Sequence, residues 1–109
     1  MFDILKNFFG KQDNSELEKA VAKNPFLVDV RSSSEFLSGS VPGAVNIPLD
    51  KIPAQLSKFK GKENIVVFCR SGNRSSEAKR ILERNGFEHV INGGTWQNVH
   101  QVVNSKQNI

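Results

Sequence analysis

The 109-residue sequence contains a single cysteine, Cys69. One cysteine cannot form an internal disulfide, and it remains available as a thiol in a reducing compartment. No apolar stretch approaches the roughly 20 residues that a membrane-spanning helix needs. The N-terminus lacks the basic start and the small-residue cleavage site of a secretory signal. We therefore expect a cytoplasmic protein that does not span a membrane.

The sequence also lacks internal repeats, low-complexity tracts and long linkers. Its net charge is +4, but no stripe of basic and aromatic residues indicates a nucleic-acid partner. The one basic cluster, Lys58 to Lys62, is short and has the pattern of a turn that leads into a strand. The length fits one domain, and the mildly basic charge favours small anionic substrates.

Short apolar runs alternate with helix-like patterns, which predicts an α/β sheet with helices on its faces. The central strand is predicted at Ile65 to Phe68, because consecutive apolar residues indicate burial on both faces. Other strands are expected near residues 26–30, 44–47 and 89–91, with a turn at 92–94. Helices are expected near residues 16–23, 32–39, 50–59, 75–85 and 95–103.

Several helix ends are predicted from capping residues. The residues expected to begin helices are Ser15, Ser32, Asp50 and Thr95. The two serines are each followed three residues later by glutamate, which is the capping-box pattern. Gly86 is placed to end the helix that follows the cysteine loop, because glycine adopts the left-handed conformation common after a helix.

The candidate site is the segment from Cys69 to Ser75, directly after the predicted central strand. Ligands of open α/β sheets bind at this carboxyl edge. Gly72 permits a sharp turn, after which backbone N–H groups and the positive end of a helix would surround the sulfur. This setting, with Arg70 and Arg74 nearby, lowers the pKa of a thiol. We therefore predict that Cys69 is a nucleophile that needs no neighbouring base.

Each of these residues also has a plainer interpretation. Cys69 is alternatively an inert core cysteine, as free cysteines often are. Arg70 and Arg74 are alternatively a pair of solvent-exposed side chains. A core cysteine does not explain two arginines and Gly72 at these spacings, so the catalytic interpretation is preferred.

Three segments, taken together and in order, resemble the rhodanese homology domain. Residues 27–31, Glu35-Phe36 and residues 41–48 are similar to the N-terminal half of that domain. Residues 66–75 are similar to its active-site strand and loop. Residues 86–96, which include Asn92-Gly93-Gly94-Thr95-Trp96, are similar to its C-terminal signature. The resemblance covers nearly the whole chain.

The resemblance implies a rhodanese-like three-layer α/β fold with a mainly parallel five-stranded sheet. It also implies a thiosulfate sulfurtransferase activity, in which Cys69 takes sulfur from a donor such as thiosulfate and becomes a persulfide. The acceptor would be cyanide, a thiol or a sulfur-acceptor protein. No metal or organic cofactor is implied. The substrate-binding residues would be those of the loop, Arg70, Ser71, Gly72, Asn73, Arg74 and Ser75.

Three charged residues of the first segment, Asp29, Arg31 and Glu35, are either a catalytic acid with its partners or structural support. We predict the structural role, with Arg31 paired to Glu35 and Asp29 holding loop backbone near the site. Trp96 is predicted in the core or in a pocket wall. Many members of the family have histidine where this chain has Ser40, but that histidine is not the sulfur carrier.

The first 14 residues lie outside the resemblance, which divides the chain into an apolar extension (1–14) and a rhodanese-like domain (15–109). Apolar residues with helical spacing occur in the extension at Ile4, Leu5, Phe8 and Phe9. We predict a helix packed on the domain. The alternatives are binding to a membrane surface or a partner, and disorder.

Two other functions compete with sulfur transfer. Phosphatases and arsenate reductases of related folds use a loop with five residues between cysteine and arginine, whereas four separate Cys69 from Arg74. The shorter loop suits one sulfur atom better than a tetrahedral phosphate. A non-catalytic recognition module is the second alternative, although inactive relatives generally lack the cysteine.

Overall fold

The computed structural model describes residues 13–107 and forms a sheet between two layers of helices. The helices are α2 (Ser15–Val21), α3 (Ser33–Leu37), the 3₁₀ helix η1 (Leu49–Phe59), α4 (Asn73–Arg84) and α5 (Trp96–Gln107). The strands are β1 (Phe26–Asp29), β2 (Val45–Asn46), β3 (Ile65–Cys69) and β4 (Val90–Thr95). Residues 1–12 lie outside the described part, and so does the predicted packing of the N-terminal extension.

All neighbouring strands of the sheet run parallel, in the order β2-β1-β3-β4. The α/β class and the parallel sheet are confirmed, although the described residues form four strands rather than the expected five. β3 lies between β1 and β4, and all five of its residues are buried. This burial explains its continuous apolar sequence, since both faces of the strand are covered.

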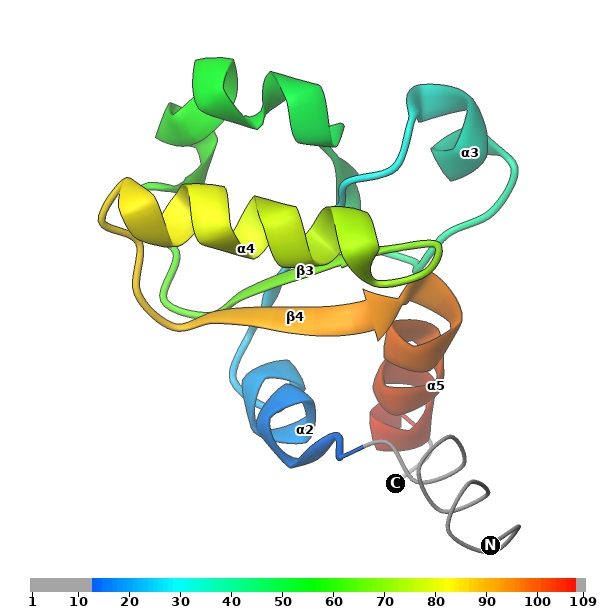
Figure 1. Ribbon diagram of the computed structural model, residues 1–109. Helices are drawn as coiled ribbons and strands as arrows, with labels where there is room; N and C mark the ends of the chain where they lie inside the picture. The colour runs from blue at the N-terminus through cyan, green and yellow to red at the C-terminus, as the bar shows by residue number, and fades with distance from the viewer. Residues whose placement is uncertain (1–12, 108–109) are drawn as a thin grey trace, which may run out of the picture.

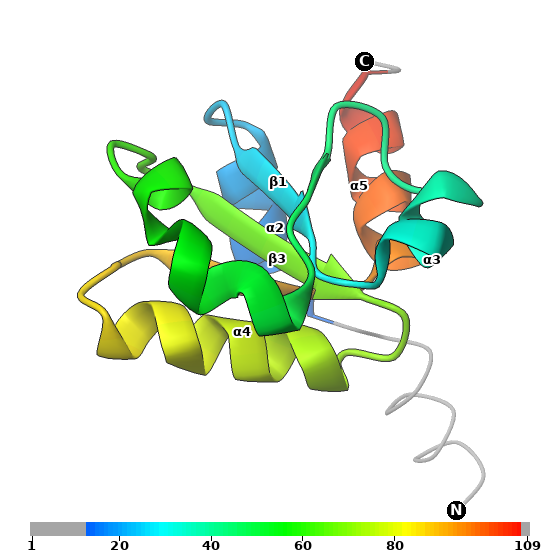
Figure 2. The same cartoon turned by 90° about the horizontal axis from the view of Figure 1, so that it is seen from above.

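The two faces of the sheet bury separate groups of side chains. Alternate residues of β3 point to opposite sides, so Val67 and Cys69 pack in one cluster while Val66 and Phe68 pack in the other. η1 and α4 cover the first face, as Figures 1 and 2 show from two directions. Cys69 therefore lies on the face that α4 covers.

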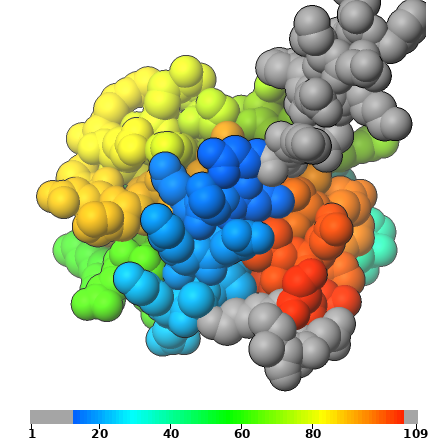
Figure 3. Space-filling model, turned by 90° about the horizontal axis from the view of Figure 1, so that it is seen from below, coloured from blue at the N-terminus to red at the C-terminus, as the bar shows by residue number. Residues whose placement is uncertain are grey.

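α2 and α5 cover the second face and lie side by side, blue beside orange-red in Figure 3. Their buried side chains, including Leu17, Ala20 and Val99, pack on the sheet. Asn14 and Asn98 join the two helices through a reciprocal pair of amide hydrogen bonds, each 3.0 Å long. In the described part of the chain, no helix is both long and apolar enough to cross a bilayer.

Helix ends agree with the capping signals at three of the five predicted positions. Ser32 and Glu35 form the full capping box of α3. Thr95 accepts a hydrogen bond from the backbone of Asn98 at the start of α5, and Gly86 has a φ of 89° just after α4. These positions were predictable because a cap satisfies backbone groups only a few residues away.

The predictions for Ser15 and Asp50 were wrong. α2 begins at Ser15 itself, because Asp13 accepts hydrogen bonds from both the backbone N–H and the hydroxyl of that serine. Asp50 lies inside η1. η1 is a kinked 3₁₀ helix rather than an α-helix, and it contains Pro53, which cannot donate a backbone hydrogen bond.

The predicted turn at residues 92–94 was also wrong, because β4 continues through it with a bulge. Val67 pairs with Asn92 and Phe68 with Gly94, so the register shifts by one residue. Gly93 is required here by close packing: a Cβ on it would lie 2.5 Å from the Val99 side chain. This glycine marks a close approach of strand and helix rather than a turn.

Candidate active site

The cysteine loop connects the end of β3 to the start of α4. Cys69 is the last residue of β3, and α4 begins only four residues later, at Asn73. Gly72, which precedes the helix, has a φ of 97°, a left-handed conformation that other residues adopt only with strain. This turn brings the N-terminal end of α4 back to the sulfur, at the right-hand end of the sheet in Figure 1.

The sulfur of Cys69 is surrounded by hydrogen-bond donors of the loop. It accepts from the backbone N–H of Gly72 at 2.9 Å and from that of Ser75 at 3.4 Å. The Ser75 hydroxyl oxygen is also 3.4 Å away. The side chain is wholly buried, so water does not compete for these contacts. Amides that converge on one atom at a helix start form an anion-binding cradle.

These contacts favour the thiolate of Cys69. Burial raises the pKa of the thiol, but the contacts with Ser75 and with the backbone N–H groups of the loop lower it by more. The net effect is that the pKa of Cys69 is lowered from its ordinary value. A lowered pKa increases the thiolate fraction at neutral pH, and the thiolate is the nucleophilic form.

A contact that sequence reasoning missed joins β4 to the loop. The Ser75 hydroxyl donates to Oδ1 of Asn92 at 2.6 Å. Nδ2 of Asn92 lies 3.5 Å from the carbonyl oxygen of Gly72. No sequence signal marks Asn92 beyond its place before the two glycines, because the contact depends on the bulge in β4.

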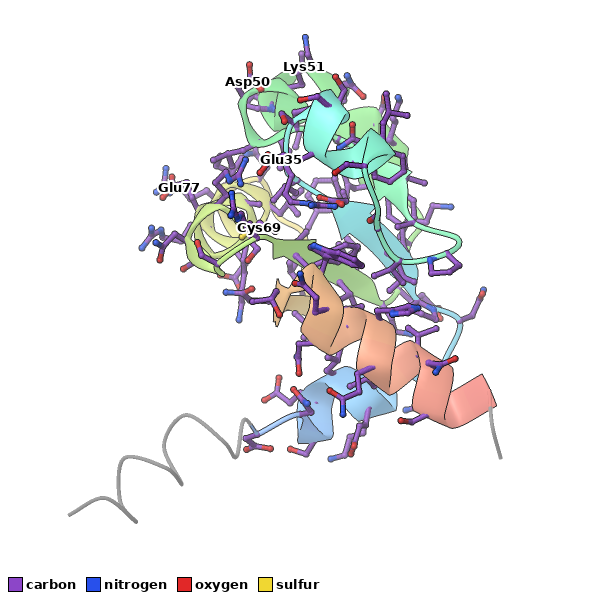
Figure 4. All side chains as sticks on the ribbon, turned by 90° about the vertical axis from the view of Figure 1, so that its right-hand side faces the viewer. Glu35, Asp50, Lys51, Cys69 and Glu77 are labelled. Atoms are coloured by element: carbon purple, nitrogen blue, oxygen red, sulfur yellow. The ribbon has the colours of Figure 1, made fainter. Side chains whose placement is uncertain are left out.

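Arg74 is held by Glu35 in a bidentate ion pair that joins α4 to α3. Nη1 and Nη2 of Arg74 lie 2.7 and 3.0 Å from the two oxygens of Glu35. Figure 4 shows Glu35 and Cys69 on the same side of the molecule, where α3 faces the start of α4. The hydrogen bonds from Arg74 hold the pKa of Glu35 far below its usual range, and the pKa of Arg74 is raised in turn.

A buried ion pair lies at the end of β1. Nη2 of Arg31 is 2.7 Å from Oδ2 of Asp29, and both side chains are almost fully buried. Asp29 also accepts from the Arg31 backbone N–H at 3.0 Å and from the Ser40 hydroxyl at 2.7 Å. Arg31 donates to the carbonyl oxygen of Gly39 and lies 5.3 Å over the Trp96 ring. The network supports the loop around α3.

Comparison with known proteins identifies the family of this fold and loop. The family model of the rhodanese-like domain matches residues 13–97. The chain belongs to the rhodanese-like family. It is 33% identical to a sulfurtransferase of Allochromatium vinosum over 82 residues, which cover 73% of this chain and 77% of the relative.

Two further comparisons agree with this assignment. The chain is 35% identical over 69 residues to the thiosulfate sulfurtransferase PspE of Escherichia coli, covering 62% of this chain and 66% of PspE. It matches the structure of a rhodanese with anions from E. coli with a TM-score of 0.62 and 32% identity, covering 68% of this chain and 89% of the other. The relatives support a sulfurtransferase role for this rhodanese-like chain.

The predicted charge partners in this rhodanese-like domain need one correction. Arg31 pairs with Asp29 rather than with Glu35, and Glu35 pairs with Arg74 instead. Residues two apart at the end of a strand point to the same side, which brings Arg31 next to Asp29. Glu35 reaches the start of α4 through Arg74, and Asp29 holds the backbone of Arg31.

The remaining loop residues of the rhodanese-like domain face solvent. Arg70, Ser71 and Asn73 are exposed. Arg70 makes no hydrogen bond or ion pair with any residue that the structure describes. Its charge is therefore unpaired among the described residues, whereas Arg74 is paired with Glu35.

Proposed function

We propose that Cys69 carries sulfane sulfur, as a persulfide, from an anionic donor such as thiosulfate to a thiophilic acceptor. The observation that carries the proposal is the cradle around the sulfur, in which the backbone N–H groups of Gly72 and Ser75 both point at Sγ. Such a cradle stabilises negative charge on sulfur without a separate base. It suits both the thiolate and a persulfide.

The transfer takes place in two displacement steps. In the first step, the Cys69 thiolate attacks the outer sulfur of thiosulfate, the S–S bond of thiosulfate breaks, and sulfite leaves with the bonding electron pair. The enzyme then holds a persulfide, whose terminal sulfur is negatively charged. In the second step, cyanide or a thiolate attacks that terminal sulfur and regenerates the Cys69 thiolate. No net oxidation of the enzyme results.

The loop supplies binding groups for the donor. The predicted substrate-binding residues run from Arg70 to Ser75, and their amides would hold the transferred sulfur. The exposed guanidinium of Arg70 would attract the charged end of thiosulfate, since it has no partner among the described residues. Arg74 would act indirectly, by fixing the start of α4 against α3.

Intact-mass spectrometry tests the proposal. The purified protein, after incubation with thiosulfate and removal of excess reagent, should gain the mass of one sulfur atom on Cys69. Cyanide should then remove that mass and release thiocyanate. The matched control is Cys69→Ser, which preserves size and polarity at a buried position but cannot form a persulfide.

The same experiment separates the alternatives. A recognition module would gain no sulfur from thiosulfate. A phosphatase would hydrolyse an aryl phosphate in a Cys69-dependent reaction without forming a stable sulfur adduct. If the parent protein remains unmodified over a range of thiosulfate concentrations, the proposed donor reaction is wrong.

A further inference from the structure

The Ser75 hydroxyl has one hydrogen and three neighbours that can accept it. Asn92 Oδ1 lies 2.6 Å from Ser75 Oγ, the carbonyl oxygen of Gly72 lies at 3.1 Å, and the Cys69 sulfur at 3.4 Å. Since hydrogen bonds weaken with distance, the hydrogen points to Asn92. The Ser75 side chain therefore donates to the sulfur, and so stabilises the thiolate of Cys69, only when its hydrogen turns away from Asn92.

The orientation of the Asn92 amide follows from its other contacts. Its Oδ1 accepts a hydrogen bond from the backbone N–H of Gly94 at 2.9 Å. Its Nδ2 faces the carbonyl oxygen of Gly72 at 3.5 Å. Rotating the amide by half a turn would place two donors against each other at Gly94, so the carbonyl oxygen must face Ser75.

The bulge of β4 places Asn92 at this point. The register of β3 and β4 shifts between Val67 and Phe68, which leaves one extra residue on β4. Bulges redirect side chains and occur often beside active sites. Here the bulge directs Asn92 toward the loop residues Gly72 and Ser75. β4 thereby reaches the sulfur through Ser75, although Asn92 itself does not contact Cys69.

We propose that Asn92 is a positioning residue that competes with Cys69 for the Ser75 hydrogen and so limits how readily the thiol ionises. When the hydrogen points to Asn92, the thiolate is stabilised by the backbone N–H groups of the loop, including those of Gly72 and Ser75. When it turns to the sulfur, the Ser75 hydroxyl becomes an additional donor. A less stabilised thiolate is a stronger nucleophile once formed, so Asn92 would balance thiolate fraction against reactivity.

Charged groups around Cys69 also influence its ionisation, and the test must leave them unchanged. β4 itself carries no titratable side chain. The charged side chains on the surrounding elements include Arg70, Arg74, Asp29 and Arg31. Figure 4 also places Glu35, Glu77, Asp50 and Lys51 on the side of the molecule where Cys69 lies. Asn92→Ala alters none of these charges, so a changed titration of Cys69 reports on the hydrogen bonds.

The ultraviolet absorbance of the thiolate, measured against pH, tests the proposal directly. Cys69 is the only cysteine, and the chain has no tyrosine whose ionisation would overlap the signal. Asn92→Ala should lower the midpoint by about half a unit, a roughly threefold increase in thiolate below the midpoint, because Ser75 can then donate to the sulfur. Asn92→Asp should raise the midpoint, because a carboxylate holds the Ser75 hydrogen more strongly and adds negative charge.

Two further variants separate this effect from simple support of the loop. In a Ser75→Ala background, Asn92→Ala should leave the midpoint unchanged, since the hydrogen that couples the residues is gone. If Asn92→Ala raises the midpoint, or lowers it equally without Ser75, Asn92 only supports the loop and the proposal is wrong. The role in catalysis rests on the proposed sulfur transfer, but the titration does not. If the titration contradicts the expectation while sulfur transfer remains intact, only the proposed role of Asn92 is rejected.

Discussion

Arg70 lies in the cysteine loop and Arg74 lies four residues later in the first turn of α4, and their surroundings differ. Both terminal nitrogens of Arg74 donate hydrogen bonds to Glu35, and the Arg74 side chain is 37% exposed. Arg70 is exposed beside Cys69. An ion pair of this geometry leaves Arg74 little free charge for an incoming anion. At the scale of residues, we therefore propose Arg70, rather than Arg74, as the group that attracts the donor.

Arg70→Ala should reduce kcat/KM for thiosulfate by about two- to tenfold, because one exposed charge-assisted contact is lost. The loss should appear mainly in KM. Raising the salt concentration should reduce kcat/KM of the parent more than that of the variant, since exposed charges are screened within about 10 Å at 0.1 M. Steady-state kinetics with thiosulfate varied at two salt concentrations measures both effects.

Arg70→Lys is the matched control and should retain most of the efficiency, because it keeps the charge. Arg74→Ala should act differently, by lowering kcat and thermal stability together as the start of α4 loosens. A parental kcat/KM in Arg70→Ala, with a large salt-sensitive loss in Arg74→Ala, would show that Arg74 rather than Arg70 binds the anion.

At the scale of elements, the ion pair between Glu35 and Arg74 connects two helices that are distant in sequence. α3 has only five residues and buries none of them, so its position depends on such contacts. Glu35 also accepts hydrogen bonds from the backbone N–H and hydroxyl of Ser32, which caps the helix. One carboxylate thus holds α3 together and ties it to the active-site loop.

The lowered pKa of Glu35 predicts an acid-sensitive contribution to stability. A carboxylate whose folded pKa is depressed stabilises the fold above its unfolded pKa, about 4.3, and this stabilisation is lost as pH falls through the folded value. Glu35→Gln should therefore lower the melting temperature by a few degrees at pH 7. The difference from the parent should shrink below about pH 4.

Glu77→Gln is the matched control for this thermal-unfolding series. Glu77 pairs with Arg80 within α4, where both side chains are largely exposed, and exposed pairs of this kind contribute little. Its melting temperature should follow that of the parent at every pH. A difference between Glu35→Gln and the parent that persists unchanged at low pH would show that ionisation of Glu35 is not the cause.

At the scale of the whole molecule, the candidate active site lies within the family-matched part of the chain. Every contact described for the site joins residues between Asp29 and Trp96, and the family match begins at residue 13. The sheet contributes Cys69 from its central strand, and α3, α4 and β4 each contribute residues around it.

Removing residues 1–12 should leave sulfurtransferase activity per folded molecule close to that of the full chain. Thiosulfate:cyanide assays on matched concentrations of both proteins measure this. Melting curves of the same samples test the predicted packing of the extension, since burial of Ile4, Leu5, Phe8 and Phe9 would stabilise the full chain. A large loss of activity without a change in melting would indicate that the extension takes part in the site.

Much of this domain was predictable because its signals are local. The apolar run of β3 indicated a buried central strand, and the position of Cys69 after it indicated the carboxyl edge of the sheet. Ser32, Thr95 and Gly86 marked helix ends, since capping involves residues only a few positions apart. The order of the motifs indicated the rhodanese-like family, and the family match agrees.

Tertiary structure decided the partners of the polar groups around the sulfur. Glu35 and Arg74 are 39 positions apart, and Ser75 and Asn92 are 17 apart. Spacing along the chain does not determine such pairs, because they depend on strand order, on the path of α3 and on the bulge in β4. The sequence by itself determined that Cys69 lies in a loop between strand and helix. Only the packing of β4 and α3 against that loop decided which side chains hold it, because a hydrogen bond requires contact in space.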